Sequence, residues 1–402
     1  MGDRAILFRQ HFPPRNDALS YWGGVPLVPQ DFTWPSFTTH DGVERALHLI
    51  MQIDCAAIPD ARRLGLPEHG LLYVFVDLDW GNFWECRVLY AEGDPRLFTP
   101  AAVPAILPHA YGDQGVWGWV RRDEDWPRLL PRWSFDPVLV NGTDLPPVVE
   151  EDEAEERRFW PGTIDLPKAL TALDGAIAES HYHQNRYDSD NKLVRPFANF
   201  PHDWKAVRIA MGEIADQSHR GHIARFVKRG DMSQAEGDAF AISLQSSIDQ
   251  WNARAQTADP IAPLATVDSD AVWQVFVDFQ KVTHFALGET VNQSINATLS
   301  ANPDPAHILP EEALALVRSS HAIGSRGEHG LHINTPDHFL GPPSYVQGGA
   351  EERLGKWRLL FEMSSCDPIG HFFAEGVYQF WIRPEDLAAR CFNRVELEGS
   401  AY

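Results

Sequence analysis

Short apolar runs separated by glycine, proline and tryptophan fill the first 165 residues of the chain. Runs that are rich in β-branched and aromatic side chains and bounded by turn residues are typical of strands. The pattern predicts strands over 46–54, 70–78 and 86–90. The first part of the chain is therefore expected to be β-rich, with irregular loops between its strands.

Apolar residues recur with the period of a helix between about residues 166 and 330. In 270–285 they follow the spacing i, i+3, i+4, i+7, which places them on one helix face. Ser233 and Glu236 have the spacing of a capping box, which predicts a helix from there to about residue 255. Asp165 and Pro310 mark two further predicted helix starts. This middle region is therefore predicted to be mostly helical.

Strand-like runs return after residue 330, in an order that resembles the first part of the chain. The first part contains GGVPLVPQ, LHLIMQID, HGLLYVFV and CRVLY, and the last part contains LGPPSYVQ, WRLLFEMS, EGVYQFWI and NRVEL. Each series passes from a Gly/Pro loop that ends in glutamine to strand-like runs. The sequence therefore predicts two β-rich half-repeats, 1–165 and 331–402, with a mostly helical insertion, 166–330, between them.

The stretch YWGGVPLVPQDFTWP, residues 21–35, is too rich in glycine and proline for a helix or a central strand. Its aromatic side chains indicate either a ligand-binding loop or a structural loop packed over a sheet. Gln52 and Asp54 are expected to hydrogen-bond this loop, because its backbone groups otherwise lack partners. The candidate binding residues of the two halves are Trp22, Trp34, Gln52, Asp54, His338 and Gln347.

The charge of the chain restricts its partners. Its 402 residues include 56 acidic and 34 basic ones, for a formal net charge of −22. Binding to nucleic acid or to an anionic membrane needs an excess of Lys and Arg, so neither is expected. A basic protein would instead be attracted. The N-terminus lacks the pattern of a secretory signal, and no apolar run approaches the ~20 residues of a membrane span. A cytoplasmic location is therefore expected.

Metal binding is the first chemistry to consider, because the chain has 17 histidines. Zinc needs three or four ligands that converge on one tetrahedron, and no His-Glu-x-x-His or Cys-x-x-Cys motif supplies them. We therefore expect no metal and no other cofactor. The histidines whose spacing would suit a metal best are His181, His183, His219 and His222.

Carboxylates offer the main catalytic alternative. The chain has no Gly-x-Ser-x-Gly elbow and no phosphate-binding glycine loop. Asp54 and Glu362 hold similar places in the two series of runs, and a pseudo-twofold axis would bring them together. Neighbouring buried carboxylates differ in pKa and can act as an acid and a base. With His338 beside them, the catalytic alternative is a hydrolase of a sugar or a peptide-like small molecule.

Motifs in both parts of the chain resemble one family. The first part has Gly23-Gly24-x-Pro26-x-x-Pro29, Trp34-Pro35, Leu49-x-x-Gln52-Ile53-Asp54 and Pro67-x-x-Gly70-Leu71-Leu72-x-x-Phe75. The last part has His338-x-Leu340-Gly341-x-Pro343-x-x-x-Gln347, Leu359-Leu360-Phe361-Glu362, Gly376-Val377-Tyr378-x-Phe380-Trp381-Ile382 and Asp386-Leu387. These motifs resemble the YwqG-like family, a domain of unknown function also called DUF1963. The likeness covers roughly 15–100 and 331–402.

The resemblance implies an α+β fold with a twisted mixed or antiparallel sheet, and no settled reaction. This chain has Glu362-Met363-Ser364 where the family usually has a Gln-x-Asp pattern. Some members resemble proteins encoded near secreted toxins, which implies an immunity role. Together with the acidic charge, this favours a non-catalytic module that binds a basic, toxin-like protein.

Overall fold

The chain divides into two compact units, one formed by Met1–Ala178 with Ser319–Tyr402 and the other by Glu179–Arg318. Strands form the core of the first unit, and four long helices lie among the described residues of the second. The residues that the computed structural model describes are 4–11, 14–78, 85–110, 128–141, 189, 192–216, 219–282, 287, 290–291, 294–295, 297–298, 309–313, 337–344, 349–364 and 376–401.

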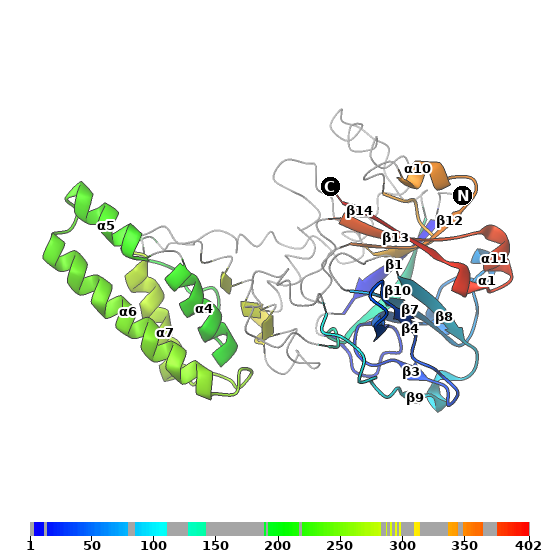
Figure 1. Ribbon diagram of the computed structural model, residues 1–402, viewed down its shortest axis with the longest axis horizontal. Coiled ribbons are helices and arrows are strands. Elements are labelled where there is room, and N and C mark those ends of the chain that lie inside the picture. Colours follow the sequence, from blue (N-terminus) through cyan, green and yellow to red (C-terminus); the bar gives the residue numbers. More distant parts are fainter. Residues whose placement is uncertain are drawn as a thin grey trace. The chain divides into compact units, whose positions relative to one another are not determined.

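The first unit is built on one ten-stranded sheet in which every described pair of strands is antiparallel (Figure 1). In sheet order the strands are β14 (Glu396–Ala401), β13 (Gly376–Ile382), β12 (Arg358–Ser364), β11 (His338–Phe339), β1 (Arg4–Gln10), β10 (Trp133–Asn141), β2 (Tyr21–Trp22), β6 (His48–Asp54), β7 (Leu71–Val76) and β8 (Cys86–Ala91). The sheet is nearly closed, since Cys86 of edge strand β8 lies 3.9 Å from the carbonyl oxygen of Val395, next to edge strand β14.

The predicted fold class, two β-rich half-repeats separated by a helical insertion, is wrong. Strands from the N-terminal and C-terminal segments form a single antiparallel sheet that dominates the structure. The reason lies in β1 and β10, which pair with each other over the whole length of β1. β1 also pairs with β11, and β10 also pairs with β2. These two central strands join the two groups that the sequence presents as separate halves.

Sequence patterns missed β10 because of Pro137. Proline cannot donate a hydrogen bond to a neighbouring strand and is rare in the middle of a sheet. Pro137 pairs with Phe8 on one side, whereas β2 covers only Trp133 and Ser134 on the other. Within the described residues, no strand pairs with the other edge of β10 at Pro137. No neighbouring strand there requires the N–H that Pro137 lacks.

An aromatic core runs across the centre of the sheet. The ring of Phe8 lies 5.5 Å from that of Trp22 and 6.0 Å from that of Phe339. Phe339 in turn lies 4.3 Å from Phe361, edge to face. All four side chains are buried, and edge-to-face contacts of this kind add to the stabilisation from burial. The core therefore spans both groups of strands.

Short elements complete the first unit. Two small two-stranded sheets pair β3 (Leu27–Val28) with β9 (Thr99–Pro100) and β4 (Ser36–Thr38) with β5 (Glu44–Ala46). The short helices are η1 (Cys55–Ala57), α1 (Ala61–Leu64), η2 (Pro95–Leu97), α10 (Gly349–Arg353), α11 (Pro384–Ala388) and η7 (Phe392–Arg394). The thiols of Cys55 and Cys86 are free and buried, and burial raises the pKa of each to about 12.

The second unit contains the helices α4 (Trp204–Asp216), α5 (His219–Arg229), α6 (Gln234–Thr257) and α7 (Thr266–Phe279), of which α6 contacts the other three. The capping box predicted at Ser233 is confirmed, with Ser233 and Glu236 bonded to each other's backbone N–H. The helix predicted over 270–285 is α7, which starts four residues earlier and ends at Phe279. Its predicted apolar stripe is buried. Among the described helices, none combines the length and apolarity needed to cross a bilayer.

Candidate functional site

The glycine- and proline-rich loop at 23–35 is fixed by a buried glutamine. Gln52 on β6 accepts hydrogen bonds from the backbone N–H of Leu27 at 2.8 Å and from the hydroxyl of Tyr21 at 3.0 Å. Its amide donates to the carbonyl of Leu19 at 2.8 Å. The Tyr73 hydroxyl donates to the carbonyl of Leu27 at 2.7 Å. We call Tyr21, Gln52 and Tyr73 with their loop the N-terminal clasp.

The loop of the N-terminal clasp needs its glycines because it lies close to the backbone of residues 130–131. Gly23 has φ +56°, and a Cβ there would lie 2.3 Å from the carbonyl oxygen of Pro131. A side chain is therefore excluded both by conformation and by space. Trp34 packs edge to face on Phe75 with ring centres 5.4 Å apart, and its indole N–H donates to the carbonyl of Leu47. These contacts give Trp34 a place in the packing of the loop over the sheet.

A second loop, at 340–344, is held by a buried carboxylate. Glu362 on β12 accepts hydrogen bonds from the backbone N–H of Ser344 at 2.8 Å and from the Ser344 hydroxyl. The amide of Gln379 on β13 donates to Glu362 and to the carbonyl of Ser344, both at 2.8 Å. His338 Nε2 lies 3.1 Å from the carbonyl oxygen of Pro342. We call His338, Glu362 and Gln379 with their loop the C-terminal clasp.

The two clasps correspond contact for contact. Tyr21 and His338 each reach the carbonyl of the residue four positions later. Gln52 and Glu362 each accept a loop N–H and directly follow a β-bulge, between Leu49 and Met51 in β6 and between Leu359 and Phe361 in β12. The difference is chemical, because Glu362 and His338 are ionisable side chains where the N-terminal clasp has an amide and a phenol.

Asp337 adds a second carboxyl group beside the C-terminal clasp. It directly precedes His338, which is paired with Glu362 across β11 and β12. The pKa of Asp337 is raised to about 7, chiefly by burial and also by the charge of Glu362, against the lowering effect of the Ser364 backbone N–H, which donates to it at 2.7 Å. A carboxyl group that titrates near neutrality can hold or release a proton under ordinary conditions.

The other predicted site residues lie in different environments. Trp22 is fully buried and packs in the aromatic core. The carboxylate of Asp54 accepts a hydrogen bond from the backbone N–H of Ala56 and caps η1, and burial raises its pKa. Asp54 on β6 and Glu362 on β12 are separated in the sheet by the four strands β2, β10, β1 and β11. Strand pairing does not make them neighbours.

The predicted metal candidates fall partly outside the described residues. His181 and His183 lie outside them, and so does Gln347, one of the candidate binding residues. His219 and His222 both belong to α5, and His222 Nδ1 lies 3.1 Å from the guanidinium of Arg225. No group of three or more His, Cys, Asp or Glu side chains within the described part of the chain is placed to hold a metal ion.

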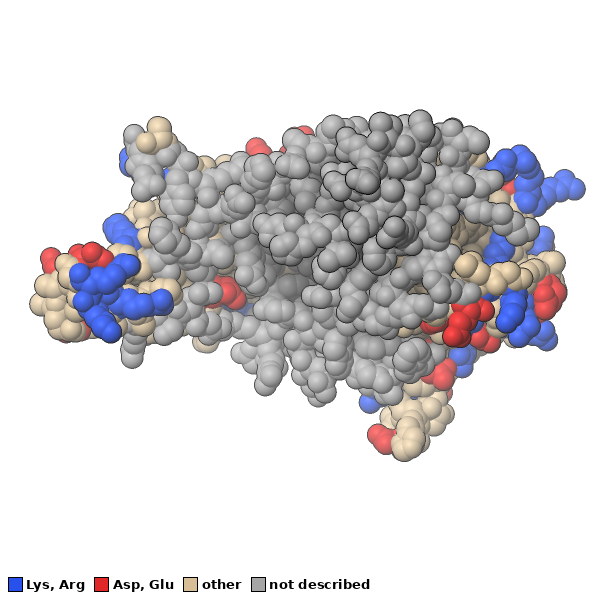
Figure 2. All heavy atoms as spheres, turned by 90° about the horizontal axis from the view of Figure 1, so that it is seen from above, with Lys and Arg blue, Asp and Glu red and all other residues tan. Residues whose placement is uncertain are grey.

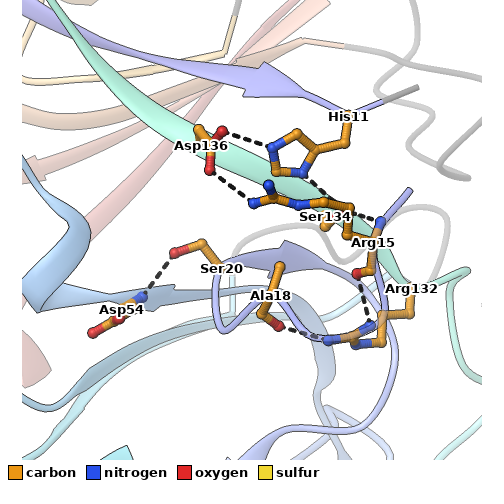
Figure 3. A network of polar contacts seen from close by, with 8 residues as sticks. All are labelled: His11, Arg15, Ala18, Ser20, Asp54, Arg132, Ser134 and Asp136. Carbon is orange, nitrogen blue, oxygen red and sulfur yellow. Dashed lines mark hydrogen bonds and ion pairs between the residues drawn. The ribbon is translucent and has the colours of Figure 1, made fainter. Parts of the chain in front are cut away.

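Sequence patterns missed a polar network on β1 and β10 (Figure 3). His11 Nδ1 lies 2.9 Å from the hydroxyl of Ser134, and Nε2 lies 2.7 Å from a carboxylate oxygen of Asp136. Arg15 binds both partners, through its backbone N–H to Ser134 and through its guanidinium to Asp136. Ser134 and Asp136 share a face because they are two residues apart on one strand, a signal that was hidden with the strand itself.

The network contains the side chains of a Ser-His-Asp triad, but its serine is placed for a structural role. Only 1% of Ser134 is exposed, and its oxygen already accepts the Arg15 N–H at 2.6 Å. The neighbouring guanidinium of Arg132 donates to the carbonyl of Ala18 (Figure 3). A nucleophile must be open to its substrate. We therefore assign this network to holding His11 and residues 14–18 against β10.

Comparison with known proteins places the chain in a family. The family model described as a domain of unknown function, DUF1963, matches residues 20–398. The chain belongs to the DUF1963 family. The match includes the middle region as well as the motifs in both outer segments, and both clasps of this DUF1963 protein lie inside it. No curated protein matches the chain.

Proposed function

We propose that this DUF1963 protein acts without catalysis, by binding a basic protein partner in the cytoplasm in the manner of an immunity protein that blocks a toxin. This proposal is supported by one observation. The side chains considered as candidates for catalysis or binding form hydrogen bonds that hold the fold together. Glu362 is fully buried and bonded to Ser344 and Gln379, and Gln52 is bonded on both its oxygen and its nitrogen. Groups engaged in this way are available to a substrate only if their loops are displaced.

The charge of the chain supports a basic partner. A net charge of −22 produces a negative potential that accelerates association with a positively charged protein. Such steering raises the association rate and is screened by salt. A binding reaction driven in this way has a recognisable signature, because its rate constant for association falls steeply with ionic strength.

The proposal is tested with any basic, toxin-like protein that a neighbouring gene encodes. Produced together, the two proteins are expected to co-purify, and the toxic activity is expected to be lost. Raising the salt concentration from 50 to 500 mM should lower the association rate constant by at least about tenfold. An unrelated protein of similar acidity is the control for charge alone. A neighbour that neither binds nor loses activity would remove the proposal.

A hydrolase remains a second candidate because of one observation, the raised pKa of Asp337 beside Glu362. Two neighbouring buried carboxyl groups, one of them with a raised pKa, are an arrangement that acid/base hydrolysis can use. In this version Asp337 supplies the proton and Glu362 is the second carboxyl group. His338, which follows Asp337 directly, pairs with Glu362 across β11 and β12. The pair differs from the predicted one, in which Asp54 faced Glu362.

The hydrolase candidate predicts turnover of small chromogenic glycosides or peptide anilides between pH 5 and 8. Asp337→Asn and Glu362→Gln are each expected to lower that turnover at least about 100-fold, because each removes one of the two carboxyl groups. Asp41→Asn, at a carboxylate whose side chain is 88% exposed, is the matched control. Absence of turnover by the unmodified protein across the panel would reject this candidate.

A further inference from the structure

The second unit carries an apolar groove between α5 and α6. The groove has a volume of about 800 Å³, and its floor is formed by side chains of both helices, including Ile223, Val227 and Ala241. Ile242 lines the groove and is 72% exposed. A large aliphatic side chain held open beside further apolar groups marks a surface that is suited to contact with another protein.

The two walls of the groove carry opposite charges. Every charged residue of α5 other than its histidines is Lys or Arg. The charged residues that line the groove from α6 are Asp238 and Asp249. Lys228 follows Ala224, a lining residue, by one helical turn and is exposed on the same face. Figure 2, which looks onto the side of this unit where α5 lies, shows Lys and Arg side chains gathered at its left end.

This division of charge makes the surface complementary to itself. In a twofold dimer the same patch is used by both subunits, and each contact occurs twice. If two copies meet groove to groove about a twofold axis that runs along the groove, basic α5 of one copy lies over acidic α6 of the other. Ile242 of each copy is then covered near the axis. The opposite arrangement, α5 over α5, places like charges together and is disfavoured.

We propose that the α5–α6 groove is the interface of a twofold homodimer, with a second copy of this chain as its occupant. The apolar floor and Ile242 form the centre of the contact, and the Lys228 and Asp238 sides form its rim. An interface of this kind has an apolar core and a polar rim. The proposal does not depend on the toxin-like partner, because it concerns only the chain with itself.

The first test uses sedimentation or light scattering of the full chain at 1–100 μM. The unmodified protein is expected to be dimeric, and Ile242→Asp is expected to raise the dissociation constant at least about 100-fold, because it places a charge in the apolar centre. Val267→Asp is the matched control, since Val267 is 74% exposed on α7 and does not line the groove. A monomer at 100 μM, or a dimer that Ile242→Asp leaves intact, would overturn the proposal.

A second test uses charge reversal and does not depend on loss of folding. Lys228→Glu and Asp238→Lys are each expected to weaken self-association at least about tenfold, because each creates like-charge pairs at both copies of the rim contact. An equimolar mixture of the two variants should form a heterodimer, since opposite charges then face each other at both contacts. Failure of the mixture to associate more tightly than either variant alone would count against the arrangement of α5 over α6 and so against the proposal.

Discussion

Replacing Asp337 by asparagine is expected to make the first unit more stable at pH 8 and to flatten the dependence of its stability on pH. Burial and the nearby Glu362 raise the pKa of Asp337 from 3.8 to about 7 in the folded protein. Asparagine has the shape of the neutral acid and can still accept the N–H of Ser364. The substitution therefore removes a charge that the folded protein disfavours.

The sign of the effect follows from proton binding. Because the folded state binds the proton of Asp337 more tightly than the unfolded state does, this group's contribution to stability is fully present below pH ~4. It is lost as the pH rises through about 7. A shift of this size corresponds to on the order of 4 kcal/mol between pH 4 and pH 8. Urea unfolding at a series of pH values measures it directly.

The control for this prediction is Asp41→Asn, at a carboxylate whose side chain is 88% exposed. It is expected to change neither the stability at pH 8 nor its slope with pH. Glu362→Gln should lower the pKa of Asp337, because it removes the neighbouring negative charge. An Asp337→Asn protein with the same pH dependence as the unmodified chain would show that Asp337 is already ionised in the fold.

Replacing Gln52 by leucine is expected to destabilise the first unit by about 2–6 kcal/mol, although the two side chains are similar in size. The change leaves the N–H of Leu27 and the carbonyl of Leu19 without the partner that Gln52 now provides. A buried polar group left unpaired costs about 1–3 kcal/mol, and two such groups are affected. Denaturant unfolding measures the loss of stability, and faster hydrogen exchange at Leu27 shows where it arises.

Two variants serve as controls for the Gln52 prediction. Gln30→Leu alters an exposed glutamine of the same loop and should change stability by less than about 0.5 kcal/mol. Gln52→Glu imitates Glu362 of the C-terminal clasp, so it keeps an acceptor for Leu27 but loses the donor to Leu19. It should fall between the leucine variant and the unmodified protein. A Gln52→Leu protein of unchanged stability would mean that the loop does not depend on the clasp.

Local patterns located many of the elements. The runs at 46–54 and 70–78 contain β6 and β7, and the run at 86–90 covers β8 except for its last residue, Ala91. Alternating or continuous apolar residues identify such strands. The helix starting after Ser233 and the stripe of α7 followed equally from capping chemistry and from helical spacing. Strand β1, β10 and the helices α4 and α5 were not predicted. Pro137 in particular made β10 hard to recognise, because proline is rare in a central strand. Among the described strands, only β1 pairs with β10 at Pro137.

Local patterns likewise identified only part of the candidate site. The sequence predicted that Gln52 holds the loop 21–35, but it matched Glu362 with Asp54, whereas Gln52 and Glu362 are the residues that hold equivalent loops. It did not reveal that Gln379 and Asp337 join Glu362, because those contacts cross between strands that are distant in sequence. The His11 network was hidden for the same reason.

The sequence by itself determined the family, the acidic charge and the positions of strands and helices whose residues form local patterns. Hydrophobic spacing, capping residues and turn glycines act over a few positions, so they can be interpreted without a partner. Only the tertiary structure decided that β1 and β10 join both segments into one sheet and that Gln379 and Asp337 lie beside Glu362. Strand pairing and buried hydrogen bonds connect residues far apart in the chain, and no local pattern specifies which will meet.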